Sequence, residues 1–84
     1  MRDFDLIVFG ATGFTGRLVA EALLEFPEPD LRWAMAGRNA DKLSAVRSEL
    51  AERFPEAALV PLVVADVTDA GSMEAMAGRT RVVC

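Results

Sequence analysis

The sequence predicts an α/β fold built on a doubly wound parallel sheet. Short apolar runs alternate with helical patterns along the whole chain, and the connections between them are brief. The strand-like runs cover residues 6–9, 31–36, 59–65 and 81–84. Alternation of this kind implies right-handed crossovers, with helices on both faces of the sheet. The simplest match is the first half of a Rossmann-type fold with strand order 3-2-1-4.

The first strand is expected at residues 6–9, an uninterrupted apolar run that stops at Gly10. Such a run is typical of a parallel strand covered on both faces. A helical pattern follows from Arg17, and Pro27 and Pro29 end it, because proline breaks a helix. The apolar residues expected on one face of this helix are Leu18, Val19, Ala22, Leu23 and Phe26.

The second strand, residues 31–36, ends at Gly37, and its Trp33 is expected in the core. Asn39 is the expected N-cap of the next helix, because its short polar side chain can accept a hydrogen bond from the first turn. Pro55 ends this helix. Its apolar stripe is expected at Leu43, Val46, Leu50 and Phe54.

The third strand, residues 59–65, contains Pro61 near its start, which indicates an edge position or an unpaired N–H there. Asp69 or Ser72 begins a short helix, and Gly78 closes it. The apolar residues of this helix are Met73 and Met76.

The fourth predicted strand, residues 81–84, is barely entered before the sequence stops. In a Rossmann-type fold this strand completes the crevice where the strand order reverses. An 84-residue chain with an open sheet edge is expected to be marginally stable alone. We therefore expect residues 1–84 to be part of a nucleotide-binding domain, either a fragment or the ordered part of a longer protein. The alternative is a mini-domain stabilised by self-association as a homo-oligomer.

The composition excludes several classes of protein. The chain is 52% hydrophobic and 26% charged, which is typical of a globular domain, and no apolar run approaches the length of a membrane span. No secretory signal is expected, and the single Cys84 excludes intramolecular disulfides and cysteine-built zinc sites, so we expect a cytoplasmic protein. The absence of histidine removes histidine-based catalysis and metal binding from this stretch of sequence. A net charge of −4 argues against nucleic-acid binding.

The strongest chemical signal is the segment GATGFTG, residues 10–16, between the first strand and the first helix. Its three glycines form a variant of the dinucleotide-binding fingerprint. Gly10 lets the chain turn sharply, Gly13 lets a pyrophosphate approach the backbone, and Gly16 lets the helix pack close to the sheet. The alternative is that these glycines only permit a tight turn.

The same segment offers hydrogen-bond donors for phosphate. The N–H groups of Phe14 and Thr15 are expected to point at the pyrophosphate, and the hydroxyls of Thr12 and Thr15 could add further bonds. Arg17, directly after the loop, is expected on solvated surface, with approach to phosphate as the alternative. Glu21 and Glu49 are expected on helix surface. A Walker-type loop is disfavoured, because no Lys-Ser or Lys-Thr follows the glycines.

The residues after the second strand predict which dinucleotide is bound. NAD-selective sites place an acidic residue there, whereas this chain has Arg38 and Asn39, about 20 residues past the glycines. A guanidinium can hold a 2′-phosphate through two hydrogen bonds, and Asn39 could share that phosphate. NADP is therefore the predicted cofactor, and NAD the alternative. A solvated arginine followed by a simple helix cap is the structural alternative.

Asp66 and Val67, after the third strand, are candidates for contact with adenine. Asp66 would accept a hydrogen bond from the exocyclic amine, and Val67 would pack on the ring. The alternative is that Asp66 caps the turn and Val67 lies in the core.

The segments GATGFTG-R-L, WAMAGRN, Lys42-Leu43 and VADV resemble the N-terminal domain of saccharopine dehydrogenase-like oxidoreductases. Trans-acting enoyl reductases of mycobacteria look similar over the same region. The resemblance implies an NAD(P)-dependent oxidoreductase with a second, substrate-binding domain for a small molecule. It assigns the phosphate loop to Gly10, Gly13 and Gly16, and the 2′-phosphate contact to Arg38. It does not imply turnover of saccharopine.

The sequence therefore predicts the dinucleotide-binding part of an oxidoreductase that uses NADP(H) for hydride transfer. No residue is predicted to be catalytic or to bind a metal, so residues 1–84 alone are expected to be inactive. One alternative is a non-enzymatic, NADP-sensing or regulatory module, because the same loop occurs in folds that only bind. Another is an α/β domain retained for assembly.

Overall fold

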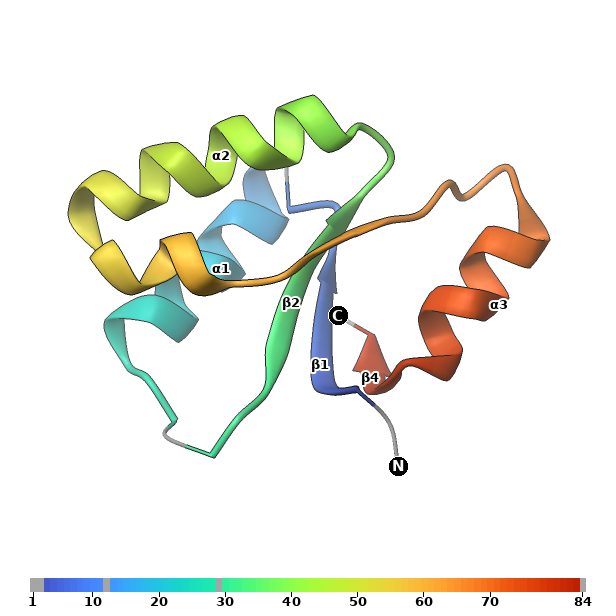
Figure 1. The fold of residues 1–84 in the computed structure, drawn as a ribbon, viewed down its shortest axis with the longest axis horizontal. Helices are drawn as coiled ribbons and strands as arrows, with labels where there is room; N and C mark the ends of the chain where they lie inside the picture. Colours follow the sequence, from blue (N-terminus) through green and yellow to red (C-terminus); the bar gives the residue numbers. More distant parts are fainter. Residues whose placement is uncertain (1–2, 12, 29, 84) are drawn as a thin grey trace.

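A computed structural model of the chain describes residues 3–11, 13–28 and 30–83. Strands and helices alternate as predicted, with one additional 3₁₀ helix, η1 (Figure 1). The strands are all parallel and lie in the order β3-β2-β1-β4, which confirms the predicted topology. The elements are β1 (Phe4–Phe9), α1 (Phe14–Glu25), β2 (Trp33–Gly37), α2 (Ala40–Arg53), η1 (Pro55–Leu59), β3 (Leu62–Val64), α3 (Ala70–Gly78) and β4 (Thr80–Val83).

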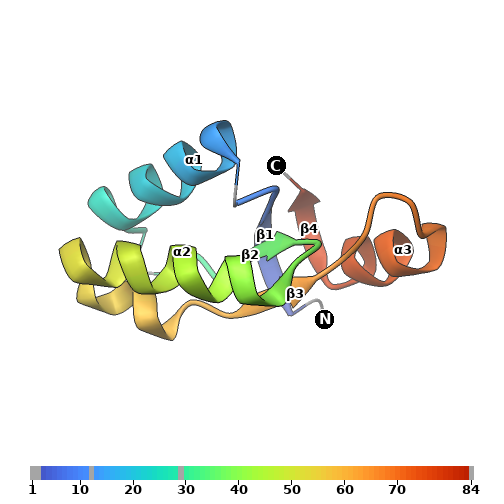
Figure 2. The ribbon, with the colours of Figure 1, turned by 90° about the horizontal axis from the view of Figure 1, so that it is seen from above.

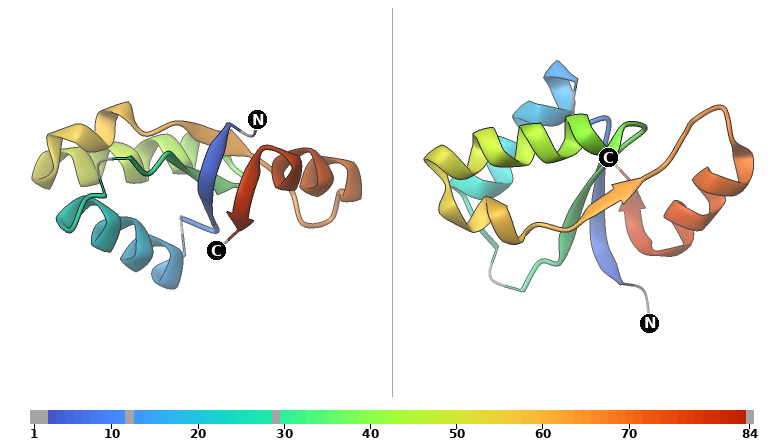
Figure 3. Two further views of the ribbon diagram at one scale, coloured as in Figure 1. Left: turned by 90° about the horizontal axis from the view of Figure 1, so that it is seen from below. Right: turned by 45° about the horizontal axis from the view of Figure 1, so that its top comes forward.

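Helices cover both faces of the sheet. Figure 2 shows α1 and α2 on one side of the strands, running side by side, and Figure 3 shows β4 beside β1 and next to α3. The core under α1 and α2 is built from Val8, Ala11, Ala20, Leu24, Met35, Leu43, Val46, Leu50, Ala57 and Val60. The core on the α3 face is built from Phe4, Ile7, Ala34, Ala36, Val63, Ala65 and Met76.

Most predicted helix features are confirmed. In α2, Leu43, Val46 and Leu50 are buried and Phe54 is half-buried beyond the helix end. In α3, Met76 is buried and Met73 half-buried. The Asn39 and Asp69 side chains cap α2 and α3 by accepting hydrogen bonds from the backbones of Lys42 and Ser72. Trp33 is half-buried against the first core.

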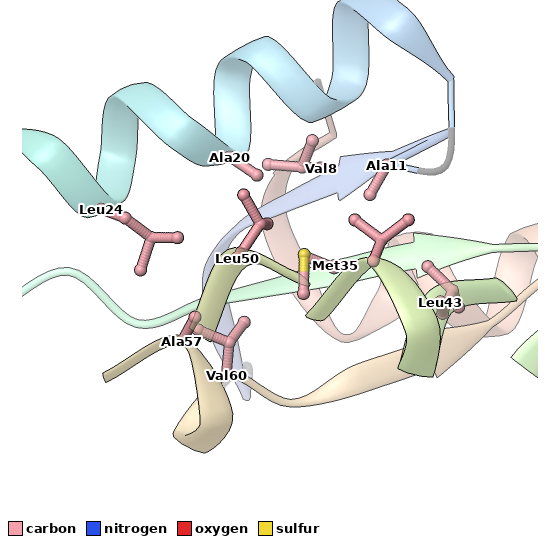
Figure 4. Packing of buried hydrophobic residues seen from close by; sticks show 10 residues of the cluster. Val8, Ala11, Ala20, Leu24, Met35, Leu43, Leu50, Ala57 and Val60 are labelled. Carbon is pink, nitrogen blue, oxygen red and sulfur yellow. The ribbon is translucent and has the colours of Figure 1, made fainter. Parts of the chain in front are cut away.

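The predicted buried face of α1 is partly wrong. Ala20 and Leu24 are buried and Val19 and Leu23 half-buried, whereas Leu18, Ala22 and Phe26 are exposed. The reason is Gly16, which lies against the backbone of the glycine turn. Residues four apart share a helix face, so this contact turns Ala20 and Leu24 toward the sheet. In Figure 4, Ala20 lies beside Val8 of β1.

The strands also begin at other residues than predicted, and β2 and β3 begin later. Residues 59–61 are not strand, because Pro55 starts η1, which ends at Leu59, and β3 keeps only Leu62–Val64. The Pro61 carbonyl still accepts a hydrogen bond from the Met35 N–H, at 3.0 Å, and β3 lies at the sheet edge as predicted. Residues 31–32 precede β2, because the Leu31 N–H closes a turn onto the Glu28 carbonyl.

Strands β1 and β4 begin earlier than predicted. The first starts at Phe4 and the last at Thr80, and these two residues are register partners. The Phe4 N–H also donates to the Arg79 carbonyl at 2.8 Å, so pairing extends to the amino ends of both strands. Thr12, Pro29 and Cys84, which carried parts of the predictions, lie outside the described residues. No helix in the described ranges is long and apolar enough to cross a membrane.

Candidate functional site

The ends of three neighbouring strands place the predicted site residues at one edge of the sheet. The N–H groups of Gly10 and Ala11 both donate to the Ala36 carbonyl, at 2.9 and 3.2 Å. The Ala65 N–H donates to the Gly37 carbonyl at 2.9 Å. These bonds continue the parallel ladder past the strands. The glycine segment, Arg38 and Asp66 therefore all leave the sheet at its carboxyl edge.

Gly10 makes the sharp turn that the sequence predicted. Its φ of +78° lies in the left-handed region that glycine adopts without steric cost. The Gly13 N–H closes the turn by donating to the Gly10 carbonyl at 2.8 Å. A Cβ on Gly13 would lie 3.3 Å from that carbonyl oxygen, so a side chain there would crowd the turn.

Gly16 is where α1 comes closest to the turn. A Cβ on Gly16 would lie 2.3 Å from the Gly10 oxygen and 2.7 Å from the Gly10 carbonyl carbon. Both atoms belong to the backbone, so no side-chain rotation can relieve the overlap. Gly16 is a close-packing position, as predicted, but the atoms closest to it belong to the turn after β1 and not to the sheet.

The amino end of α1 differs from the ends of the other two α-helices. Its N-cap is Gly13, which has no side chain to accept a hydrogen bond. The first helical bond runs from the Arg17 N–H to the Gly13 carbonyl at 3.0 Å. In the described part of the chain, the N–H groups of Phe14, Thr15 and Gly16 have no acceptor. As far as the described residues go, three donors at the positive end of a helix therefore face no protein acceptor, and such donors favour an anion.

A cavity of about 350 Å³ adjoins this turn. Its polar lining is the glycine backbone and Thr15, and the exposed ring of Phe14 stands at its side. The cavity is lined by Val8, Phe9, Gly10, Gly13, Phe14, Thr15, Gly16 and Val19.

Arg38 follows β2 directly and is exposed. Among the residues that the structure describes, it forms no hydrogen bond or ion pair, although its charge acts on Asp66. Asn39 accepts a hydrogen bond at Oδ1 from the Lys42 N–H at 3.1 Å, which confirms its role as a cap. The amide nitrogen of Asn39 is the part of its side chain left for a ligand.

Asp66 shapes the turn after β3. Its Oδ1 accepts hydrogen bonds from the Thr68 N–H at 2.9 Å and the Thr68 hydroxyl at 2.8 Å, so its predicted turn-capping role is confirmed. These two donors, and then the Arg38 guanidinium, hold the pKa of Asp66 below its ordinary value of 3.8. Oδ2 has no hydrogen-bond partner in the described ranges. Val67 is 63% exposed, so its placement in the core is wrong.

The lowered pKa of Asp66 predicts a pH-dependent stability. Its carboxylate stabilises the fold fully above its ordinary pKa of 3.8, and this contribution is lost as the pH falls through the lower pKa of the folded chain. We expect Asp66→Asn to lower the Tm near neutral pH, and the difference from wild type to shrink below about pH 4. Thr68→Ala, which keeps the backbone donor, should show a smaller effect of the same sign. A Tm difference that is constant with pH would contradict this assignment.

One group of contacts was missed by the sequence reasoning. Arg17 Nη1 lies 2.7 Å from Glu49 Oε2 on α2, and Arg17 Nε lies 3.6 Å from Glu21 Oε1. Glu21 Oε1 is also 3.8 Å from Arg53 Nη1. The spacing of Arg17 and Glu21 on one helix could have revealed their pair. The partner 32 residues away could not be found from local pattern.

The topology and the glycine turn define the class of this chain. A parallel sheet in the order β3-β2-β1-β4, with the turn at the carboxyl end of β1, is a partial Rossmann-type fold. No group of histidine, cysteine, aspartate and glutamate residues within the described ranges could hold a metal ion.

Relatives of the chain carry the name of one kind of reductase. Over 82 residues, 98% of the chain, it is 46% identical to the trans-acting enoyl reductase of Mycobacterium leprae (strain TN). It is 44% identical over the same length to the trans-acting enoyl reductases of Mycobacterium tuberculosis (strain H37Rv) and Mycobacterium bovis (strain BCG / Pasteur 1173P2). The chain spans 19% of the length of each of these relatives.

The relatives confirm the similarity to trans-acting enoyl reductases that the sequence motifs indicated. None of them bears on the saccharopine dehydrogenase-like family. No protein-family model and no solved structure matches the chain.

Proposed function

We propose that this chain is the dinucleotide-binding part of an NADP(H)-dependent oxidoreductase of the enoyl reductase type. The observation that carries the proposal is the turn at the carboxyl end of β1. There, among the residues that the structure describes, the first amides of α1 behind the glycine N-cap have no acceptor, and Arg38 at the same edge has no ion-pair partner. The names of the relatives support the reductase assignment.

The diphosphate of the cofactor would bind at the glycine turn. The N–H groups of Phe14, Thr15 and Gly16 are donors at a positive helix end, which is the arrangement that favours phosphate. Gly13 keeps this approach free of a side chain. The residues present therefore fit a pyrophosphate, and Thr12 would add its hydroxyl.

The adenosine half would lie toward β2 and β3. The Arg38 guanidinium would hold the 2′-phosphate, which favours NADP over NAD, and the Asn39 amide nitrogen would assist. Asp66 Oδ2 would accept a hydrogen bond from the adenine amine, and the exposed side chain of Val67 would cover the ring.

The bound nicotinamide would supply the hydride for reduction of an enoyl group, and the chain itself would bind and orient the cofactor. We assign no catalytic residue within this stretch. A second domain would bind the substrate, and the word trans-acting in the relatives' names supports a separate partner protein. The cofactor would bind in the way that the resemblance to saccharopine dehydrogenase-like oxidoreductases implies. We place the protein in the cytoplasm.

Isothermal titration calorimetry of the full-length protein with NADPH and with NADH tests this proposal. We expect saturable binding of both cofactors, with NADPH bound more tightly. Oxidation of NADPH in the presence of an enoyl thioester would support a reductase, whereas binding without turnover of any acceptor would favour an NADP-sensing module. Absence of binding would overturn the proposed function.

A further inference from the structure

We propose that Arg17 is a positioning residue that holds the first turn of α1 in register with α2. This inference rests on the proposed function, because the first turn carries the amides assigned to the diphosphate. It adds a residue outside the glycine segment whose guanidinium acts on the site through Glu49 and not by contact with the cofactor.

The first turn of α1 has little else to hold it. The side chains of Phe14, Thr15 and Leu18 are exposed, and the buried face of the helix begins only with Val19 and Ala20. For residues 13–18, the ion pair of Arg17 with Glu49 is the one side-chain hydrogen bond or ion pair to another element within the described structure. Gly16 packs closely on the turn, but it has no side chain that could form a hydrogen bond or ion pair with another element.

The other side of the ion pair is firmly anchored. Helix α2 carries Glu49 and buries Leu43, Val46 and Leu50 in the core. It also follows Arg38 and Asn39 directly, so its position fixes the residues assigned to the 2′-phosphate. A link from Arg17 to α2 therefore couples the two phosphate-binding segments.

The geometry of Arg17 argues against direct contact with phosphate. Its Nη1 is 2.7 Å from Glu49, and its Nε faces Glu21, which is itself shared with Arg53 of α2. The guanidinium is thus engaged by two carboxylates, and its side chain is partly screened from solvent.

Glutamine substitutions separate the two roles. If Arg17 positions the helix, Arg17→Gln and Glu49→Gln should each weaken NADPH and NADH about two- to five-fold, and the double variant no more than either single one. If Arg17 binds phosphate directly, Glu49→Gln frees it and should leave affinity unchanged or tighter. Glu52→Gln is the matched control. Glu52 is exposed, lies three residues after Glu49 on α2, and has no hydrogen-bond or ion-pair partner among the described residues.

Amide hydrogen exchange of the ligand-free, full-length protein gives a second readout that does not depend on the cofactor. We expect exchange at residues 17–19 to accelerate about two- to five-fold in both Arg17→Gln and Glu49→Gln, and Arg17→Lys to restore part of the protection. Unchanged exchange in both variants would overturn the inference. Failure of the wild-type protein to bind either dinucleotide would overturn the proposed function, and the exchange data would still decide whether Arg17 holds the helix.

Discussion

Gly16→Ala should destabilise the fold by on the order of 3 kcal/mol and remove dinucleotide binding. The new methyl carbon would lie 2.3 Å from the Gly10 oxygen, where only movement of the backbone can make room. That movement would either push α1 off the sheet or open the turn whose amides are assigned to the diphosphate. Denaturant unfolding of the full-length protein measures the loss of stability, and NADPH titration of the folded fraction measures the loss of binding.

Gly78→Ala is the matched control for this prediction. A Cβ on Gly78 would meet nothing within 4 Å, and Gly78 is the last residue of α3, far along the chain from the turn. We expect its unfolding free energy and NADPH affinity to remain close to those of the wild type. If Gly16→Ala changed the unfolding free energy and the NADPH affinity as little as Gly78→Ala, the proposed close contact between α1 and the turn would be contradicted.

Arg38→Ala should weaken NADPH roughly ten- to hundredfold and leave NADH almost unchanged. A charge-assisted hydrogen bond is worth about 1.5–3 kcal/mol, and this contact would exist only with the cofactor that carries a 2′-phosphate. Arg38 is exposed and forms no hydrogen bond or ion pair with the described residues, so its removal should change stability little. Paired titrations of the two cofactors, with the Tm as a check on folding, measure the effect.

Lys42→Ala is the comparison for Arg38→Ala. It removes an equal charge from exposed surface in the first turn of α2 while keeping the backbone N–H that Asn39 caps. We expect it to change NADPH affinity much less than Arg38→Ala does. Equal loss of NADPH and NADH in Arg38→Ala would contradict the assignment of Arg38 to the 2′-phosphate.

Local pattern alone determined most of the architecture. The topology follows from alternating apolar runs and helical segments, because parallel strands require crossovers and crossovers have one hand. The turn at Gly10 and the caps at Asn39 and Asp69 were also predictable, since backbone conformation and capping depend on residues a few positions apart. The same holds for placing Arg38 and Asp66 at one sheet edge, because each follows the end of a strand by one or two residues.

Packing decided what local pattern left open. Two apolar stripes compete on α1, and the contact of Gly16 with the turn selects the one that contains Ala20 and Leu24. The pairing of Arg17 with Glu49 joins residues 32 positions apart, and no periodicity reports which exposed charges of two helices will meet. Such choices depend on distances between elements, which exist only once the sheet has brought the helices together.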